Sequence, residues 1–203
     1  MPLADRTEPP ATPTRASTEA STEASTATPS AAALPDYWSF VQAAQRRISE
    51  EFPDADLAAN RVFLSLNRSS STAVYDFESS IHRPAGGTWS SFRLLLALWV
   101  AGPLNPHEAA RLTGMSRAAV SNLTGTLVGK DLLRREASAA DGRSVTLHLT
   151  EAGQEKIRTA FRAQNDRESQ WAEALTEEEQ HTLVTLLEKL MEQRERIGAR
   201  ARK

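Results

Sequence analysis

The 203-residue chain contains no cysteine. This absence excludes disulfides, thiolate metal ligands, a cysteine nucleophile and thiol-based redox sensing. The chain also lacks the run of about 18 apolar residues that a membrane-spanning helix needs, since its longest run covers only residues 94–101. The N-terminus has no basic-then-apolar signal-peptide pattern. We therefore expect a cytoplasmic protein that does not bind membranes.

Patterns typical of catalysis and metal binding are missing as well. None of the four histidines lies three or four positions from another, and no cysteine could complete a zinc site. The sequence has no glycine-rich phosphate loop, no nucleophile elbow and no zinc-protease motif. We expect no metal, no cofactor and no enzymatic activity.

Residues 1–35 differ in composition from the rest of the chain. They are mostly Ala, Ser, Thr, Pro and Glu, contain six of the ten prolines and have no aromatic residue. Such a segment buries too little apolar area to offset the entropy cost of ordering it. We predict a disordered tail at 1–35, a folded domain at 36–195 and a basic C-terminal tail at 196–203. A phosphorylated or partner-binding arm is the alternative for the first tail.

Apolar residues at helical spacing predict three helices in the first half of the domain, at 36–51, 54–81 and 89–101. Asp54 and Thr88 are the expected N-caps of the second and third helices. Proline and glycine residues separate the three segments, as expected for helix ends.

The next segment predicts a helix-turn-helix. Asn105 is an N-cap, Pro106 suits the first helical position and Glu108 completes a capping box. After a glycine-containing turn, Ser116 caps a second helix with a small, polar exposed face. Its expected buried stripe consists of Val120, Leu123 and Leu127. Two short helices in this arrangement are typical of DNA-binding proteins.

A β-hairpin is predicted after the second helix. Residues 132–135 form one strand, and apolar residues alternate with polar ones over 145–149 in a half-buried second strand. Asp141-Gly142 supplies a turn between them, and two helices follow at about 150–174 and 176–191. The fold class is mainly α with a small two-stranded β-wing, a winged helix-turn-helix.

The segments NPHEAARLTGMSRAAVSNLTGTLVGKDLLRR and DGRSVTLHLTEAG resemble the MarR (multiple antibiotic resistance regulator) family of bacterial winged helix-turn-helix repressors. The order of elements over roughly residues 54–195 is also similar. The resemblance implies a winged helix-turn-helix at about 88–149 and dimerisation helices at about 36–83 and 150–195. Asp131 departs from the family, which usually has glycine there, but Asp can adopt the left-handed conformation.

Positive charge gathers on the helix-turn-helix, with five basic residues against one acid between Arg111 and Arg135. The N-terminus of the second helix can bind a phosphate group, and the side-chain amide of Asn122 can pair with adenine. The resemblance implies that Arg143 at the wing tip enters the minor groove, with Asp141 holding it. We expect DNA contacts from Ser116, Arg117, Ala118, Ser121, Asn122, Lys130, Arg134, Asp141 and Arg143. An ordinary solvated strand is the alternative for Arg134 and Arg135, and an ordinary hairpin residue is the alternative for Arg143.

These observations predict a homodimeric, sequence-specific regulator that binds double-stranded DNA and lies on the nucleoid when bound. The apolar faces of the outer helices exceed what one winged domain can cover, which indicates a dimer. We expect a ligand-responsive repressor of a pseudo-palindromic operator. The alternative is a winged-helix module for protein–protein contact without a DNA role.

The resemblance implies a small effector, commonly an aromatic acid, held between the dimer helices and the winged domain. The residues expected to line such a pocket are Trp38, Tyr75, Trp89 and Arg93. Rings can stack on a planar ligand and a guanidinium can bind its carboxylate. A core position for Trp89 and a solvent-facing Arg93 are the alternatives. The helix at 36–51 is similar to that of urate-type regulators, but the acidic residue they carry is missing from 89–101, so urate is not expected.

Overall fold

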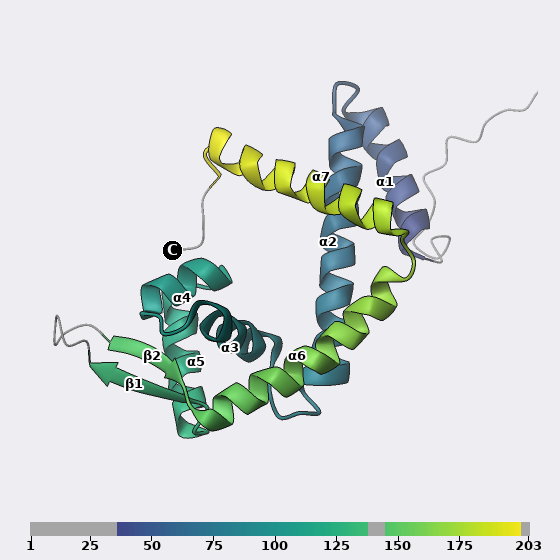
Figure 1. Ribbon diagram of the computed structural model, residues 1–203. Helices are drawn as coiled ribbons and strands as arrows, with labels where there is room; N and C mark the ends of the chain where they lie inside the picture. The colour runs from purple at the N-terminus through teal and green to yellow at the C-terminus, as the bar shows by residue number, and fades with distance from the viewer. Residues whose placement is uncertain (1–35, 138–144, 200–203) are drawn as a thin grey trace, which may run out of the picture. The chain divides into compact units, whose positions relative to one another are not determined.

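The computed structural model describes residues 36–137 and 145–199. In these ranges the chain forms seven α-helices, one π-helix and two β-strands (Figure 1). It divides into two units, which meet in sequence between Leu64 and Ser65. No helix in the described ranges has both the length and the apolar character needed to cross a bilayer.

The first unit contains α1 (Tyr37–Glu51) and the beginning of α2 (Leu57–Phe77). The Tyr37 hydroxyl donates a 2.6 Å hydrogen bond to the Leu64 carbonyl, joining the two helices. The sequence prediction that Asp54 caps the second helix is wrong. Asp56 is the cap, because its carboxylate accepts a 2.9 Å hydrogen bond from the Ala59 N–H, while residues 53–54 form the turn between the helices.

The second half of α2 belongs to the other unit and ends differently from the predicted helix over 54–81. The last turn is a π-helix, η2 (Glu78–His82), in which backbone hydrogen bonds span five residues instead of four. It ends with His82 buried, its Nε2 lying 2.9 Å from the Gln164 Oε1. The sequence pattern missed this widening because Gln164 lies far along the chain.

The three helices of the winged domain are α3 (Trp89–Ala101), α4 (Pro106–Thr113) and α5 (Arg117–Gly129). Their N-caps are Thr88, Asn105 and Ser116, as the sequence predicts. Gly114 takes the left-handed conformation in the turn between α4 and α5, with φ 65°. The predicted helix-turn-helix is therefore confirmed.

The wing strands β1 (Leu133–Ala137) and β2 (Val145–Leu149) pair antiparallel, with Leu133 opposite Leu149. Figure 1 shows the hairpin beside α5. The predicted half-buried alternation is correct for Leu147, which is fully buried, but wrong for Val145, which is 36 % exposed. Leu147 also exchanges backbone hydrogen bonds with Leu104, so the helices cover the base of the hairpin and leave Val145 outside.

The helices α6 (Glu151–Ala172) and α7 (Glu177–Arg196) complete the chain. A close backbone contact fixes the start of α6: a Cβ built on Gly153 would lie 2.0 Å from the Leu132 carbonyl oxygen. Asp131 adopts the left-handed conformation expected of it, with φ 56°. Thus any larger residue at 153 forces the backbone to shift, and the turn before β1 tolerates aspartate.

The hydrophobic core lies in the winged domain and the first turns of α6. Its buried members are Phe92, Leu94, Leu95, Leu98, Leu104, Ala109, Ala110, Met115, Val120, Leu127, Leu133, Leu147 and Ile157. By contrast, α7 contributes no buried residue. Most of its apolar side chains are exposed, namely Leu183, Val184, Leu186, Leu190 and Met191, and Leu187 is half-buried.

Candidate nucleic-acid interface

One face of α5 is exposed and carries small polar or basic side chains. Val120 and Leu127 on the opposite face are 0 % and 3 % exposed and pack in the core. Five predicted DNA contacts therefore share one helix and its cap; four of them, Arg117, Ala118, Ser121 and Asn122, are exposed, and Ser116 is half-buried.

The N-terminus of α5 suits a phosphate group. The Ser116 Oγ accepts a 3.2 Å hydrogen bond from the Ala119 N–H and so fixes the first turn. The remaining first-turn N–H groups and the helix dipole favour an anion there. Arg117 stands exposed at the first helical position and adds positive charge.

Two of the predicted DNA contacts, Lys130 and Arg134, have protein partners in this structure. The Lys130 ammonium donates a 2.9 Å hydrogen bond to the Gly86 carbonyl, in the loop before α3. On β1, Arg134 pairs with Glu136, and this hydrogen bond is the main reason that the pKa of Glu136 lies below its ordinary value. Glu136 also lies 3.4 Å from His148, the cross-strand partner of Arg134.

Arg135 is a basic residue whose place only the structure shows. A Cβ built on Gly125 would lie 4.0 Å from an Arg135 guanidinium nitrogen, so this side chain runs beside α5, the recognition helix of the helix-turn-helix. The sequence indicates its positive charge but not its position at the interface. Asp141 and Arg143 lie outside the described residues.

The residues expected to line an effector pocket are distributed over both units. Trp38 belongs to the first unit, where its ring contacts Tyr37 edge-on and is 56 % exposed. In the second unit Tyr75 is 72 % exposed, whereas Trp89 stacks on Phe92 with ring centroids 5.7 Å apart. This stacking places Trp89 at the edge of the core.

Arg93 lines a cavity of about 310 Å³ between α3 and α4. The other lining residues are mainly apolar: Leu96, Ala97, Val100, Ala101, Leu112 and Thr113. Of the four expected pocket residues, only Arg93 borders this cavity. A guanidinium at the edge of an apolar hollow suits a ligand with a carboxylate and an apolar body.

Two polar clusters near the end of α2 have no counterpart in the sequence pattern. Asp76 accepts two hydrogen bonds from Arg167, at 2.7 and 2.9 Å, and one from the Trp171 indole N–H at 2.8 Å. The Arg167 bonds, more than the Trp171 bond, hold the pKa of the Asp76 carboxyl far below its usual range. Burial lowers the pKa of His82. No local pattern marks either residue, because the partners lie more than 80 positions away.

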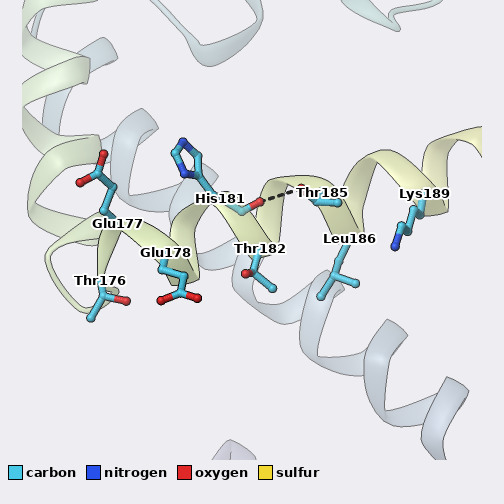
Figure 2. Close-up of a pocket in the computed structure, with 8 residues that line it drawn as sticks. All are labelled: Thr176, Glu177, Glu178, His181, Thr182, Thr185, Leu186 and Lys189. Carbon is cyan, nitrogen blue, oxygen red and sulfur yellow. Dashed lines mark hydrogen bonds between the residues drawn. The ribbon is translucent and has the colours of Figure 1, made fainter.

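A further hollow, of about 770 Å³, is lined by α7 and its cap alone. Figure 2 shows Glu178, Thr182 and Leu186 projecting from one side of this helix. A hollow with a single wall is an open helix face and encloses no ligand. In the described ranges, no group of three acidic or histidine side chains is placed to hold a metal ion.

Comparison with known proteins agrees with this geometry. The model of the MarR family matches residues 86–144. A Bacillus subtilis protein, the uncharacterized HTH-type transcriptional regulator YwaE, is 29 % identical over 135 residues, which cover 66 % of this chain and 79 % of YwaE.

Two solved structures share the fold. Sco3205 of Streptomyces coelicolor, a MarR family regulator solved in complex with DNA, has a TM-score of 0.62 at 24 % identity, covering 66 % of this chain and 85 % of its own. Bordetella bronchiseptica BpsR, solved to explain regulation of its DNA binding by 6-hydroxynicotinic acid, has a TM-score of 0.60 at 24 % identity, covering 64 % and 98 %.

The fold and the exposed recognition helix define a DNA-binding winged helix-turn-helix protein. The matches in sequence and fold confirm the resemblance found in the sequence: the chain is similar to MarR family winged helix-turn-helix transcriptional regulators. Its relatives are transcriptional regulators, which confirms the expectation that it is not an enzyme.

Proposed function

We propose that the protein is a homodimeric repressor that binds a pseudo-palindromic operator and releases it when a small effector binds. The observation that carries this proposal is the exposed polar face of α5, whose opposite face is locked in the core. The alternative, a winged-helix module for protein contacts, leaves the basic charge around α5 without a role. We place the protein in the bacterial cytoplasm, on the nucleoid when bound.

The DNA sequence is recognised by the exposed face of α5 and by the wing. Asn122 can form a bidentate pair with adenine in the major groove, and Ser121 lies beside it. Arg117 neutralises phosphate at the helix N-terminus. We assign minor-groove contact to Arg143, with Asp141 holding it, as in the resemblance that the sequence shows. The DNA complex of Sco3205 supports this use of the fold.

Dimerisation accounts for the apolar surface of α7. Among the described residues, this helix has none buried, and Leu183, Leu186 and Leu190 lie exposed at helical spacing on it. An exposed apolar stripe on a 20-residue helix is stabilised when a second copy covers it. A two-fold dimer then reads half-sites about 10 base pairs apart, centre to centre.

The effector we propose is a small aromatic acid. It binds between the dimerisation helices and the winged domain. Arg93 is the residue that the cavity beside α3 supports most directly, with Trp38, Tyr75 and Trp89 as the remaining candidates. The regulation of BpsR by 6-hydroxynicotinic acid supports an acid of this class. Release follows from a preference of the ligand for a dimer with wrongly spaced recognition helices.

A mobility-shift assay with the DNA upstream of the protein's own gene tests DNA binding. We expect Arg143→Ala to weaken binding, and Asn122→Ala to relax base preference by about 1–3 kcal/mol at one position. The matched controls are Arg162→Ala and Asn165→Ala, two exposed residues of α6. Unchanged operator affinity in both test variants at the same salt concentration contradicts the assignment.

Titration of the protein–operator complex with aromatic carboxylates tests the effector. We expect release of DNA by at least one acid and a weaker response in Arg93→Ala. Because the chain has no cysteine to oxidise, we expect peroxide not to release the DNA. Reversible release by peroxide would contradict a mechanism based on ligand binding.

A further inference from the structure

The two arginines of β1 lie on opposite faces of the hairpin. Side chains alternate along a strand, so Arg135 shares a face with Leu133, which is 2 % exposed and belongs to the core. Arg135 also runs beside α5. Arg134 and Glu136 lie on the other face, together with His148, which pairs with Arg134 across the strands. The hairpin thus has an inner face toward the recognition helix and an outer face away from the core.

The outer face carries three charged or titratable side chains, Arg134, Glu136 and His148, which we call the outer wing cluster. Glu136 is its centre, because one carboxylate oxygen pairs with the Arg134 guanidinium and lies 3.4 Å from the His148 Nε2. The hydrogen bond from Arg134 is the main cause of the lowered pKa of Glu136, and His148 adds to it. Glu136 is therefore ionised at neutral pH and neutralises Arg134.

The pair of Arg134 and Glu136 is open to solvent. Their side chains are 56 % and 54 % exposed, so a phosphate group can reach the guanidinium. An exposed ion pair adds little to stability, because water and salt screen it. The main consequence of Glu136 is therefore electrostatic: it cancels one positive charge on the wing.

The cancelled charge belongs to the part of the chain that carries the DNA-binding charge. Arg134 is one of the five basic residues between Arg111 and Arg135, a segment that contains the recognition helix. Contacts between cations and phosphates supply most of the sequence-independent affinity for DNA, because each one releases condensed counterions. A carboxylate that holds the Arg134 guanidinium removes one such contact.

We propose that Glu136 is a negative determinant of DNA affinity: it holds the Arg134 guanidinium in the outer wing cluster and keeps it from binding a backbone phosphate. Phosphate contacts carry no sequence information. Glu136 therefore limits affinity for duplex DNA of any sequence and leaves base preference to α5. This inference rests on the proposed function only in that the protein binds duplex DNA.

Fluorescence anisotropy with two labelled duplexes tests the proposal. One duplex is the DNA upstream of the protein's own gene, and the other is a random sequence of equal length. Glu136→Gln keeps the size of the side chain and removes its charge. We expect it to strengthen binding to both duplexes about five- to tenfold near 0.1 M salt, and to steepen the plot of log K against log salt concentration by about 0.9. A purely structural role of Glu136 would not change that slope.

The matched control is Glu51→Gln, which gives the protein the same net charge. Glu51 pairs with Arg47 on α1, outside the winged domain, and the two side chains are 49 % and 57 % exposed. We expect this variant to bind both duplexes as the wild type does. Thermal melts verify that every variant is folded.

Combination with Arg134→Met shows whether Glu136 acts through Arg134. Arg134→Met alone leaves an unpaired carboxylate on the wing and should weaken binding to both duplexes. The double variant restores the zero charge of the native pair and should bind as the wild type does. The proposal is overturned if the double variant binds as tightly as Glu136→Gln alone, because the carboxylate then acts without Arg134. It is also overturned if Glu136→Gln leaves the affinity and the salt dependence unchanged.

The two duplexes separate this inference from the proposed function. Equal strengthening by Glu136→Gln, in a protein that prefers the upstream DNA, supports both. Equal strengthening in a protein without that preference supports the role of Glu136 and refutes sequence-specific regulation. A wild-type preference for the upstream DNA, with no effect of Glu136→Gln, keeps the proposed function and overturns the inference. Absence of binding to either duplex, by the wild type and by Glu136→Gln, overturns both.

Discussion

Replacement of Gly153 by alanine tests the tightest contact in the structure. Gly153 lies in the first turn of α6, and an added Cβ would meet the Leu132 carbonyl oxygen at 2.0 Å and a Leu149 methyl group at 3.3 Å. Real Cβ atoms almost never approach another heavy atom within 3.0 Å. The first turn of α6 must therefore move by at least the difference, 3.0 minus 2.0 Å, away from the strand residues.

The cost of that movement can be worked from the bonds it stretches. The Thr150 N–H donates to the Leu132 carbonyl at 3.2 Å, and the Thr150 hydroxyl donates to the Asp131 carbonyl at 2.6 Å. Losing two such bonds costs about 2 kcal/mol, and forced overpacking costs about 1–3 kcal/mol more. Alanine returns about 1 kcal/mol of helix propensity. We expect Gly153→Ala to lower the free energy of unfolding by about 2–4 kcal/mol.

Urea unfolding followed by circular dichroism measures this change, and in a chain of this size it corresponds to a fall in Tm of roughly 10 °C. The matched control is Gly129→Ala in α5, where an added Cβ meets nothing within 4 Å. The control should be as stable as the wild type or slightly more stable. The reasoning is refuted if Gly153→Ala unfolds at the wild-type urea concentration, or if the control is destabilised equally.

Three further predictions concern pH and assembly. Asp76→Asn should lower the Tm at neutral pH because Arg167 loses its anionic partner. Since the pKa of Asp76 is depressed in the folded state, its carboxylate stabilises the fold above the ordinary pKa of about 3.9 and loses that effect at lower pH. A Tm difference between wild type and variant that grows on acidification contradicts this. The pKa of buried His82 is also lowered, so the unfolded chain takes up its proton first and stability falls as pH drops through about 6.5. His82→Gln, which can still bond to Gln164, should flatten that profile, and an unchanged profile would count against the assignment. In sedimentation experiments Leu186→Glu should shift the protein from dimer to monomer, and an unaltered dimer would exclude α7 from the interface.

The sequence alone was sufficient for the helix-turn-helix. Asn105, Glu108 and Ser116 make their capping hydrogen bonds within three residues, so their chemistry is readable from local order. The same holds for the buried stripe of α5 and for the left-handed Asp131, whose conformation depends on its immediate neighbours. The assignment of the family followed from these local features.

The sequence could not predict contacts between side chains and partners far away along the chain. Lys130 suggested a phosphate contact, yet its ammonium meets a carbonyl 44 residues earlier in the chain, and Arg134 meets an acid from the same strand. The DNA contacts themselves, the dimer and the effector residues stay predictions. What the tertiary structure adds to the candidate site is the position of Arg135 beside α5.

Local hydrogen bonding determined which segments of this chain become helices and strands, because a cap or an apolar stripe acts within one or two turns. Only the tertiary structure decided that α2 ends in a π-turn, since His82 must reach Gln164 across 82 positions. It alone decided that a side chain at position 153 is destabilising, because the clashing carbonyl belongs to another segment. Such contacts depend on how distant segments pack, and no periodicity in the sequence records them.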